Sequence, residues 1–443
     1  MALNAFALRG DIIHSLDPQR LSCTEDGYLV CEDGLSAGVF AELPKRFEDI
    51  EVCDFSGHMI IPGLVDLHTH APQFANRGLG MDLELLDWLN TYTFPEESRF
   101  SDLEYAKIVY HAFVDELLCG ATTRAAIYAT PHLPATLLLM ELLEDSGLST
   151  MVGKLNMDRN TIPSLVEESA QASLDATREW LYSLLARDFL HTAPILTPRF
   201  IPTCSDELMR GLSELQKEFS LPLQSHLSET QAEIEWVHNL CPNSANYTDA
   251  YLRLGLLGGE GCPVIMAHCV YCDPHETALL KQQGVWIAHC PVSNTCIASG
   301  IAPVRSFLDQ GLHIGLGTDV SGGYSLSMLH CIAEVIKVSK LRWRLVDDSL
   351  APLTLAEAFY LATRGGGSFW GNVGSFVEGF CFDAVVIADA QQSVAKYAHE
   401  PAATQSQQPV IKALSLENRL ERLIYTDANS RVLSKYVDGQ RIF

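Results

Sequence analysis

The chain has 443 residues, of which 47% are hydrophobic and 19% charged, so it can bury a large core and is long enough for two domains. Its formal net charge of -25 and its pI near 4.9 argue against nucleic acid as a partner, because proteins that bind a phosphate backbone display basic faces. A small neutral substrate suits this composition better.

The beginning of the chain predicts neither secretion nor membrane insertion. It has no basic leader before its first apolar residues and no clear small-residue cleavage site. No segment approaches the roughly 18 uninterrupted apolar residues of a membrane span. The thirteen cysteines, an odd number scattered through apolar runs, are typical of buried thiols in a reducing compartment. We therefore expect a cytoplasmic protein that does not bind membranes.

Residues 1–61 contain short strand-like pieces separated by turns such as TEDG and EDGL, which predict the first part of a small β-sandwich. From residue 62 to residue 371, short apolar runs alternate with longer amphipathic segments, the pattern of repeated βα units. Eight apolar runs occur, at about 60–68, 119–127, 149–156, 192–200, 221–227, 262–269, 285–291 and 312–319. Helices are expected between them, for example at 103–119, 164–186, 205–219 and 230–239. Eight units predict an α/β fold, a closed (β/α)8 TIM-like barrel.

Residues 372–443 show the same pattern as the N-terminal flank, with short apolar stretches and turns such as VDGQ. The two flanks are therefore expected to form one β-sandwich beside the barrel, its N-terminal part from 1–61 and its C-terminal part from 372–443. A polar stretch at 391–408, rich in Gln, Ala and Ser, is interpreted as a surface loop.

The most informative motif is the pair His68 and His70, which ends the first apolar run. On a β-strand, residues i and i+2 project from the same side, so both imidazoles can reach one cation. Other metal-binding residue types also end apolar runs: His226 in HLSE, His268 in MAHC and Asp319 in LGTDVS. Active sites of such barrels occupy the C-terminal ends of the strands. The sequence therefore predicts that these side chains converge.

Imidazoles together with a carboxylate form a nitrogen and oxygen site suited to a divalent ion such as Zn²⁺. Such an ion can lower the pKa of water from about 15.7 to about 7, which favours hydrolytic chemistry. Glu229 follows His226 by three residues and can face the same pocket, where it could transfer protons.

Several other residues have simpler interpretations. His289 in HCPVSN is expected only to flank the pocket, and His330 to lie in a helix. Cys269 and Cys272 form a CxxC pair, but without a second pair they are interpreted as core thiols. For Arg199, at the end of the fourth run, a structural ion pair and a substrate contact both remain open.

Longer strings carry a resemblance to a known family. PGLVDLHTHAPQ, SHLSE, MAHC and LGTDVS resemble the amidohydrolase superfamily, and LLDWLNTYTFPEE and TPRFIPTCSDELM resemble its guanine deaminases. The resemblance extends from about residue 10 to residue 439. It implies a zinc-dependent enzyme that hydrolyses guanine to xanthine and ammonia, and which usually forms homodimers.

The resemblance also implies roles for particular residues. It implies Zn²⁺ ligands at His68, His70, His226 and Asp319, and one ion per chain, since TPRF places no lysine at the fourth strand end to bridge two metals. It implies that His268 holds the attacking water, that Asp319 accepts the proton of this water and that Glu229 shuttles protons. Substrate contacts fall on Gln73, Arg199 and Phe200. Trp88 is added as an apolar face for the ring, although packing in the core explains this residue better than recognition of a substrate.

Two alternatives remain beside this interpretation. One is another mononuclear amidohydrolase, acting on an adenosine-like, cytosine-like or triazine substrate; the other is a catalytically silent scaffold with the same fold. A cytidine-deaminase fold is disfavoured, because its H-x-E and P-C-x-x-C signature is missing.

Overall fold

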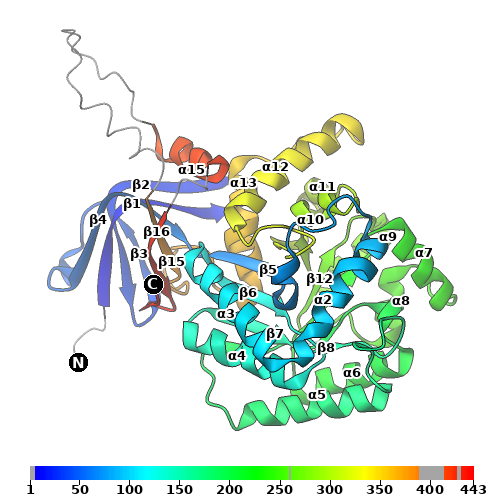
Figure 1. Cartoon of the computed structure of the whole chain (residues 1–443). Coiled ribbons are helices and arrows are strands. Elements are labelled where there is room, and N and C mark those ends of the chain that lie inside the picture. The colour runs from blue at the N-terminus through cyan, green and yellow to red at the C-terminus, as the bar shows by residue number, and fades with distance from the viewer. Residues whose placement is uncertain (1–4, 259–260, 389–413, 427–430) are drawn as a thin grey trace.

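A computed structural model describes residues 5–258, 261–388, 414–426 and 431–443. The polar stretch at 391–408, interpreted above as a surface loop, lies outside the described residues. In Figure 1 a strand-rich unit built from both ends of the chain lies beside a larger unit of strands surrounded by helices. The fold is therefore a barrel with a flanking strand-rich unit, as the sequence predicts.

The strand-rich unit contains one seven-stranded mixed sheet in the order β17-β16-β15-β4-β1-β2-β3. Its strands are β1 (Ala5–Asp17), β2 (Arg20–Glu32), β3 (Leu35–Phe40), β4 (Glu51–Pro62), β15 (Ala384–Ala388), β16 (Arg431–Val437) and β17 (Gln440–Arg441). The neighbours β1 and β4 are parallel, and β4 and β15 are antiparallel. The first and last segments of the chain therefore share one sheet.

The two layers of this unit arise because the single sheet curls over. Phe6 in β1 stacks on Tyr436 in β16 with ring centroids 5.5 Å apart, although two strands separate β1 from β16 in the sheet. Neighbouring strands lie about 4.8 Å apart, so a flat sheet could not bring these rings together. A bridge between Leu35 and Cys381 brings the β3 edge back to the segment before β15. The sandwich predicted from the sequence is thus one curled sheet.

The larger unit is a barrel of parallel strands. Its strands are β5 (Leu64–His70), β6 (Thr122–Tyr128), β7 (Ser149–Gly153), β8 (Leu155–Asn156), β9 (Thr192–Pro194), β10 (Thr197–Pro198), β11 (Leu223–Leu227), β12 (Val264–His268), β13 (Trp286–His289) and β14 (His313–Leu316). They form the runs β5-β6-β7-β9 and β11-β12-β13-β14. A bridge between Leu196 and Leu223 joins the two runs on one side. On the other side, Asp319 N donates to His68 O at 2.8 Å, which ties the end of β14 to β5.

The apolar runs in the sequence locate these strands, with two differences. The first run, 60–68, spans two sheets, because β4 ends at Pro62 in the curled sheet and β5 begins at Leu64 in the barrel. The third and fourth runs are each broken into two short strands, and the second members, β8 and β10, pair with each other. Buried parallel strands read as continuous apolar runs, so a change of sheet within one run leaves no mark in the pattern.

Helices cover the barrel on its outside (Figure 1). The longer ones are α3 (Leu103–Cys119), α4 (Leu133–Ser146), α5 (Ala170–Leu185), α6 (Asp206–Phe219), α7 (Gln231–Leu240), α8 (Tyr247–Leu254), α9 (Pro274–Gln283) and α12 (Met328–Leu345). Shorter ones are α1 (Leu85–Trp88), α2 (Phe94–Ser98), α10 (Pro291–Cys296), α11 (Val304–Asp309) and α13 (Leu355–Tyr360). Helix α15 (Leu416–Tyr425) packs against α12 and the curled sheet. The helix expected at 164–186 begins only at Ala170, because the Ser169 side chain accepts from Ala172 N and caps it there.

Buried charges join the two units. Arg124 in β6 pairs with Asp383, just before β15, at 2.6 Å, and their side chains are 6% and 0% exposed. Lys435 in β16 donates to Leu117 O at 2.8 Å and to Thr122 O at 2.9 Å. We propose that residues 62–371 form the barrel unit and that 1–61 and 372–443 form the strand-rich unit.

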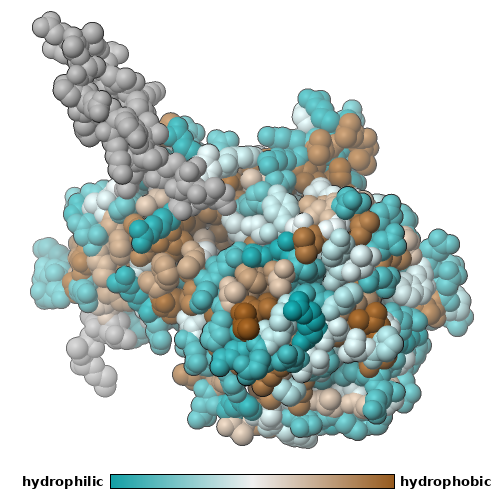
Figure 2. Space-filling model, in the orientation of Figure 1, coloured by the Kyte–Doolittle hydropathy of each residue, from teal (hydrophilic) through white to brown (hydrophobic). Residues whose placement is uncertain are grey.

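On the face drawn in Figure 2, hydrophobic side chains lie among hydrophilic ones over the strand-rich unit and at the projecting end of α12. Leu345 in α12 is 75% exposed, and Leu185 and Leu190 are 77% and 84% exposed. Within the described ranges, no helix is both long and apolar enough to cross a membrane.

Candidate active site

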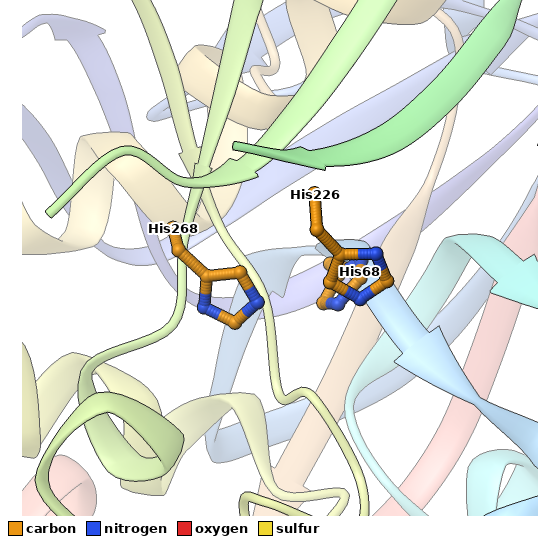
Figure 3. A group of neighbouring side chains, drawn as sticks. All are labelled: His68, His226 and His268. Atoms are coloured by element: carbon orange, nitrogen blue, oxygen red, sulfur yellow. The ribbon is translucent and has the colours of Figure 1, made fainter. Parts of the chain in front are cut away.

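The side chains expected to converge do converge at the C-terminal ends of the barrel strands. His68 and His70 are at the end of β5, His226 is in β11 and His268 is the last residue of β12. Figure 3 shows the imidazoles of His68, His226 and His268 directed into one space from these strands. Asp319 follows β14 and is held there by its backbone bond to His68. All of these side chains are buried.

Three Nε2 atoms and one carboxylate oxygen form the centre of the cluster. His70 Nε2 lies 3.3 Å from the Nε2 atoms of both His68 and His226. Asp319 Oδ1 lies 3.1 Å from His68 Nε2 and 3.4 Å from His70 Nε2. His226 Nδ1 lies 2.7 Å from Arg199 O. Because a carbonyl only accepts, the proton of His226 is on Nδ1, and Nε2 presents a lone pair to the cluster.

The pKa shifts of these groups favour the protonation states in which they can bind a metal ion. Burial lowers the pKa of His70 to about 3 and that of His226 well below its ordinary value. Burial alone would raise the pKa of Asp319, but the neighbouring imidazoles, His68 first, hold it well below its usual range. Neutral imidazoles and an ionised carboxylate are the forms that bind a metal ion. Lone pairs that converge at such short distances are stabilised by a shared cation, so the residues fit a divalent metal.

His268 lies at the edge of this cluster. Its Nδ1 lies 2.9 Å from Asn294 Oδ1 in α10. Its Nε2 lies 3.5 Å from Glu229 Oε2 and 3.9 Å from Asp319 Oδ2. The Nε2 atom of His268 therefore lies between the two carboxylates.

Glu229 stands at the turn between β11 and α7 and is 3% exposed. Its backbone N–H donates to Glu233 Oε2 at 2.8 Å, and its Oε1 accepts from Ser299 Oγ at 2.8 Å. Burial, and then the charge of Asp319, raises the pKa of Glu229 to about 8. A carboxyl group that can hold a proton near neutral pH is suited to general acid and base catalysis.

A small cavity opens beside the cluster. It is lined by His70, Gln73, Leu85, Trp88, Leu89, Arg199, Phe200, His226, Glu229, His268, Ile297 and Asp319. Of the residues assigned to the site from the sequence, only His68 is missing from this lining, and it lies beneath the others with no exposed surface. A larger open groove over α7, α8 and α9 contains none of them.

Trp88 both packs in the interior and lines the cavity. The side chain lines the cavity, but it is 3% exposed and its Nε1 donates to Leu79 O at 3.0 Å. It therefore packs within the segment 79–89 and presents only part of its ring to a bound molecule.

The structure adds residues that the sequence reasoning missed. Glu97 in α2 pairs with Arg199 at 2.6 Å and accepts from Gln73 Nε2 at 2.7 Å. Asn294 and Ser299 contact His268 and Glu229 as described above. Glu97 belongs to the motif LLDWLNTYTFPEE, but nothing in the sequence pattern distinguishes it from the adjacent Glu96.

The histidines and cysteines with simpler interpretations stay outside the cluster. His330 Nε2 lies 2.8 Å from the Tyr324 hydroxyl, in α12. All thirteen cysteines are free thiols, including Cys269 and Cys272. Cys290 lies near His268 and Asp319; burial, and then the charge of Asp319, raises the pKa of its thiol well above the usual range, so it is a neutral thiol and a poor ligand.

Comparison with known proteins agrees with this geometry. The model of the amidohydrolase family matches residues 59–440. The guanine deaminase of Dictyostelium discoideum is 35% identical, with 98% of this chain and 97% of that protein covered. The guanine deaminase of Rattus norvegicus is 38% identical, with 86% of each chain covered.

Solved structures extend the comparison. The guanine deaminase from C. acetobutylicum with bound guanine in its active site is 40% identical and superposes with a TM-score of 0.91, covering 99% of this chain and 100% of that one. A triazine hydrolase from Arthrobacter aurescens superposes with a TM-score of 0.78, but at 18% identity it shares the fold alone.

Proposed function

The chain belongs to the amidohydrolase family, and from this premise we infer that it is a guanine deaminase, which hydrolyses guanine to xanthine and ammonia. The observation that carries this inference is similarity over the full length to a guanine deaminase that holds guanine in its active site. The buried cluster of imidazoles and carboxylates beside a cavity lined by aromatic and polar side chains supports it independently.

We propose that the metal is one Zn²⁺ per chain, held by His68, His70, His226 and Asp319. Their atoms fit a nitrogen and oxygen site, and the neutral imidazoles and ionised carboxylate are ready to bind. When bound, such an ion supplies activation of water at neutral pH.

The proton transfers are assigned to residues around the cluster. Asp319 accepts the proton of the water that attacks C2 of guanine, and His268 holds this water through a hydrogen bond. Glu229 protonates the ring nitrogen next to C2, so negative charge does not accumulate there. Glu229, now a carboxylate, takes the proton of the new C2 hydroxyl group and passes it to the exocyclic nitrogen, so the C2–N bond breaks and ammonia leaves. The proton on Asp319 then returns to Glu229. The water oxygen remains on C2 and yields xanthine.

Substrate contacts are assigned to Gln73, Arg199, Phe200 and Trp88, all of which line the cavity. Arg199 and Gln73 can donate hydrogen bonds to acceptors of the base. Phe200 and Trp88 can cover its apolar faces.

The proposal includes a cytosolic location and a homodimer. The free state of all thirteen cysteines supports a reducing compartment. Sedimentation at several protein concentrations would test the homodimer.

The proposed function is tested by incubating metal-replete protein with a panel of purines, pyrimidines and triazines and measuring ammonia release. We expect guanine to be the preferred substrate and the protein to contain one equivalent of zinc. Preferred turnover of adenosine, cytosine or a triazine would assign the site to a different substrate, and turnover of no compound by zinc-loaded protein would indicate a silent scaffold.

A further inference from the structure

A buried carboxylate outside the cluster of histidines and Asp319 hydrogen-bonds two of the proposed substrate-binding side chains. Glu97 is 1% exposed and lies in α2, in the excursion of the chain between β5 and α3. Its Oε2 is 2.6 Å from Arg199 Nη1, and its Oε1 accepts from Gln73 Nε2 at 2.7 Å. One side chain therefore holds both polar groups on that wall of the cavity.

These contacts determine which way the Gln73 amide points. Its Oε1 accepts from the backbone N–H of Ser321 at 3.1 Å, while its Nε2 faces the Glu97 carboxylate. A reversed amide would place an NH₂ group against the Ser321 N–H and an oxygen against the carboxylate, and both contacts would be repulsive. The acceptor of Gln73 is thus occupied by the protein, and one N–H of its Nε2 remains for a ligand.

Arg199 also presents N–H hydrogen-bond donors to the cavity. Its guanidinium carries five N–H donors and no acceptor, and in the described part of the chain Glu97 is its only hydrogen-bonding acceptor. The Phe94 ring lies 5.0 Å from its Cζ and limits its movement. Since its side chain is 4% exposed and lines the cavity, the remaining donors are available to a bound molecule.

We propose that Glu97 is a positioning residue that makes this wall of the cavity a donor-only surface, selective for purines with an oxo group at C6. The inference rests on the proposed function and deepens it. A 6-oxo group accepts hydrogen bonds from such donors, whereas a 6-amino group would set N–H against N–H and leave buried donors unpaired. Sites built to hydrogen-bond one group reject an analogue that cannot make the bond. Glu97 acts through Arg199 and Gln73 and does not touch the base.

The test uses Glu97→Gln, which keeps the size of the side chain but removes the charge that orders both donors. Glu96→Gln is a matched control on the same helix, because Glu96 bonds Tyr105 and Arg99 outside the cavity. Glu97→Asp, which keeps the charge, should partly restore the wild-type behaviour.

Hypoxanthine and adenine are the probes, because they differ only at C6 and at the adjoining N1: hypoxanthine presents an oxo group and an N1–H, and adenine presents an amino group and an unprotonated N1. We expect hypoxanthine to inhibit wild type and Glu96→Gln at least about tenfold better than adenine, the scale of one hydrogen bond. Glu97→Gln should reduce this ratio by about tenfold and raise KM for guanine by a similar factor, with a smaller change in kcat. Its zinc content should be unchanged.

An unchanged inhibition ratio in Glu97→Gln would overturn the proposal. If Glu97→Gln does not fold, the Glu97→Asp ratio decides: an intermediate value supports positioning, and a wild-type ratio contradicts it. If the wild-type protein does not deaminate guanine, the proposed function fails, but calorimetric titration with hypoxanthine and adenine still measures the selectivity assigned to Glu97.

Discussion

Replacing Glu229 by Gln should leave a folded, metal-loaded protein that has lost most of its turnover. The Oε1 atom of Glu229 accepts from Ser299 Oγ at 2.8 Å, and a glutamine oxygen can keep this bond. Its Oε2 lies 3.5 Å from His268 Nε2, and an amide nitrogen in that place can neither take up nor release a proton. The change therefore isolates proton transfer, because size and burial are preserved.

A positioned general acid and base contributes about 10²–10⁴-fold to a rate, which corresponds to about 2.7–5.5 kcal/mol of the barrier. Ser299→Ala is a milder variant with which the loss of turnover in Glu229→Gln can be compared. It removes one hydrogen bond to Glu229 but leaves the carboxyl group, so it should cost about 0.5–1.5 kcal/mol, or roughly 2- to 13-fold in kcat. In the Glu229→Gln background the same Ser299→Ala change should cost less, because Ser299 acts through Glu229.

The assay measures kcat from ammonia release at saturating guanine, zinc by elemental analysis, and hypoxanthine binding, all on one preparation. We expect normal zinc and normal binding with the lowered kcat. Loss of zinc would show that Glu229 is a ligand, and normal turnover would show that another residue moves the protons. Either result would refute the role assigned to Glu229.

The remaining predictions concern the metal, the substrate and stability. His68→Ala should lose the ion and nearly all activity but keep its circular dichroism spectrum; retained zinc would contradict the ligand set. Arg199→Ala should lower kcat/KM for guanine by about 1.5–3 kcal/mol at normal zinc content, because the backbone carbonyl that holds His226 remains; an unchanged kcat/KM would return Arg199 to a structural role. Asp383→Asn leaves the buried charge of Arg124 less compensated and should lower the free energy of unfolding by about 3 kcal/mol, measured from thermal unfolding. Burial lowers the pKa of His14 to about 4 from 6.5, so the contribution of His14 to the free energy of unfolding is complete above pH 6.5 and is lost as the pH falls through 4. His14→Asn should remove about 3 kcal/mol of that pH dependence. Identical plots of stability against pH for wild type and variant would contradict this prediction.

Much of the fold could be predicted from local patterns. Alternating apolar and amphipathic segments identified the barrel strands, and the strand period placed His68 and His70 on one side of β5. Chemistry then selected His226, His268 and Asp319, because few residue types bind metal ions and each of these ends an apolar run. The barrel topology gathers the C-terminal ends of parallel strands at one face, so their convergence followed from the fold class.

Other features depend on contacts between distant segments, which local patterns do not encode. The curled sheet was expected as a sandwich, because strand period and turns predict strands but not which of them pair. The run at 60–68 crosses from one sheet to the other, since β4 and β5 are both buried and apolar where they meet.

The sequence by itself determined the barrel, the residue types of the proposed metal site and the strand ends on which they stand, because period and ligand chemistry are properties of short segments. Only the tertiary structure decided how the polar side chains on the wall of the proposed substrate cavity are held. Glu97 reaches Arg199, 102 positions further along the chain, and the same carboxylate orients Gln73. In the sequence Glu97 is one of two adjacent acids; burial against an arginine and an amide, which only the folded chain provides, distinguishes it from Glu96.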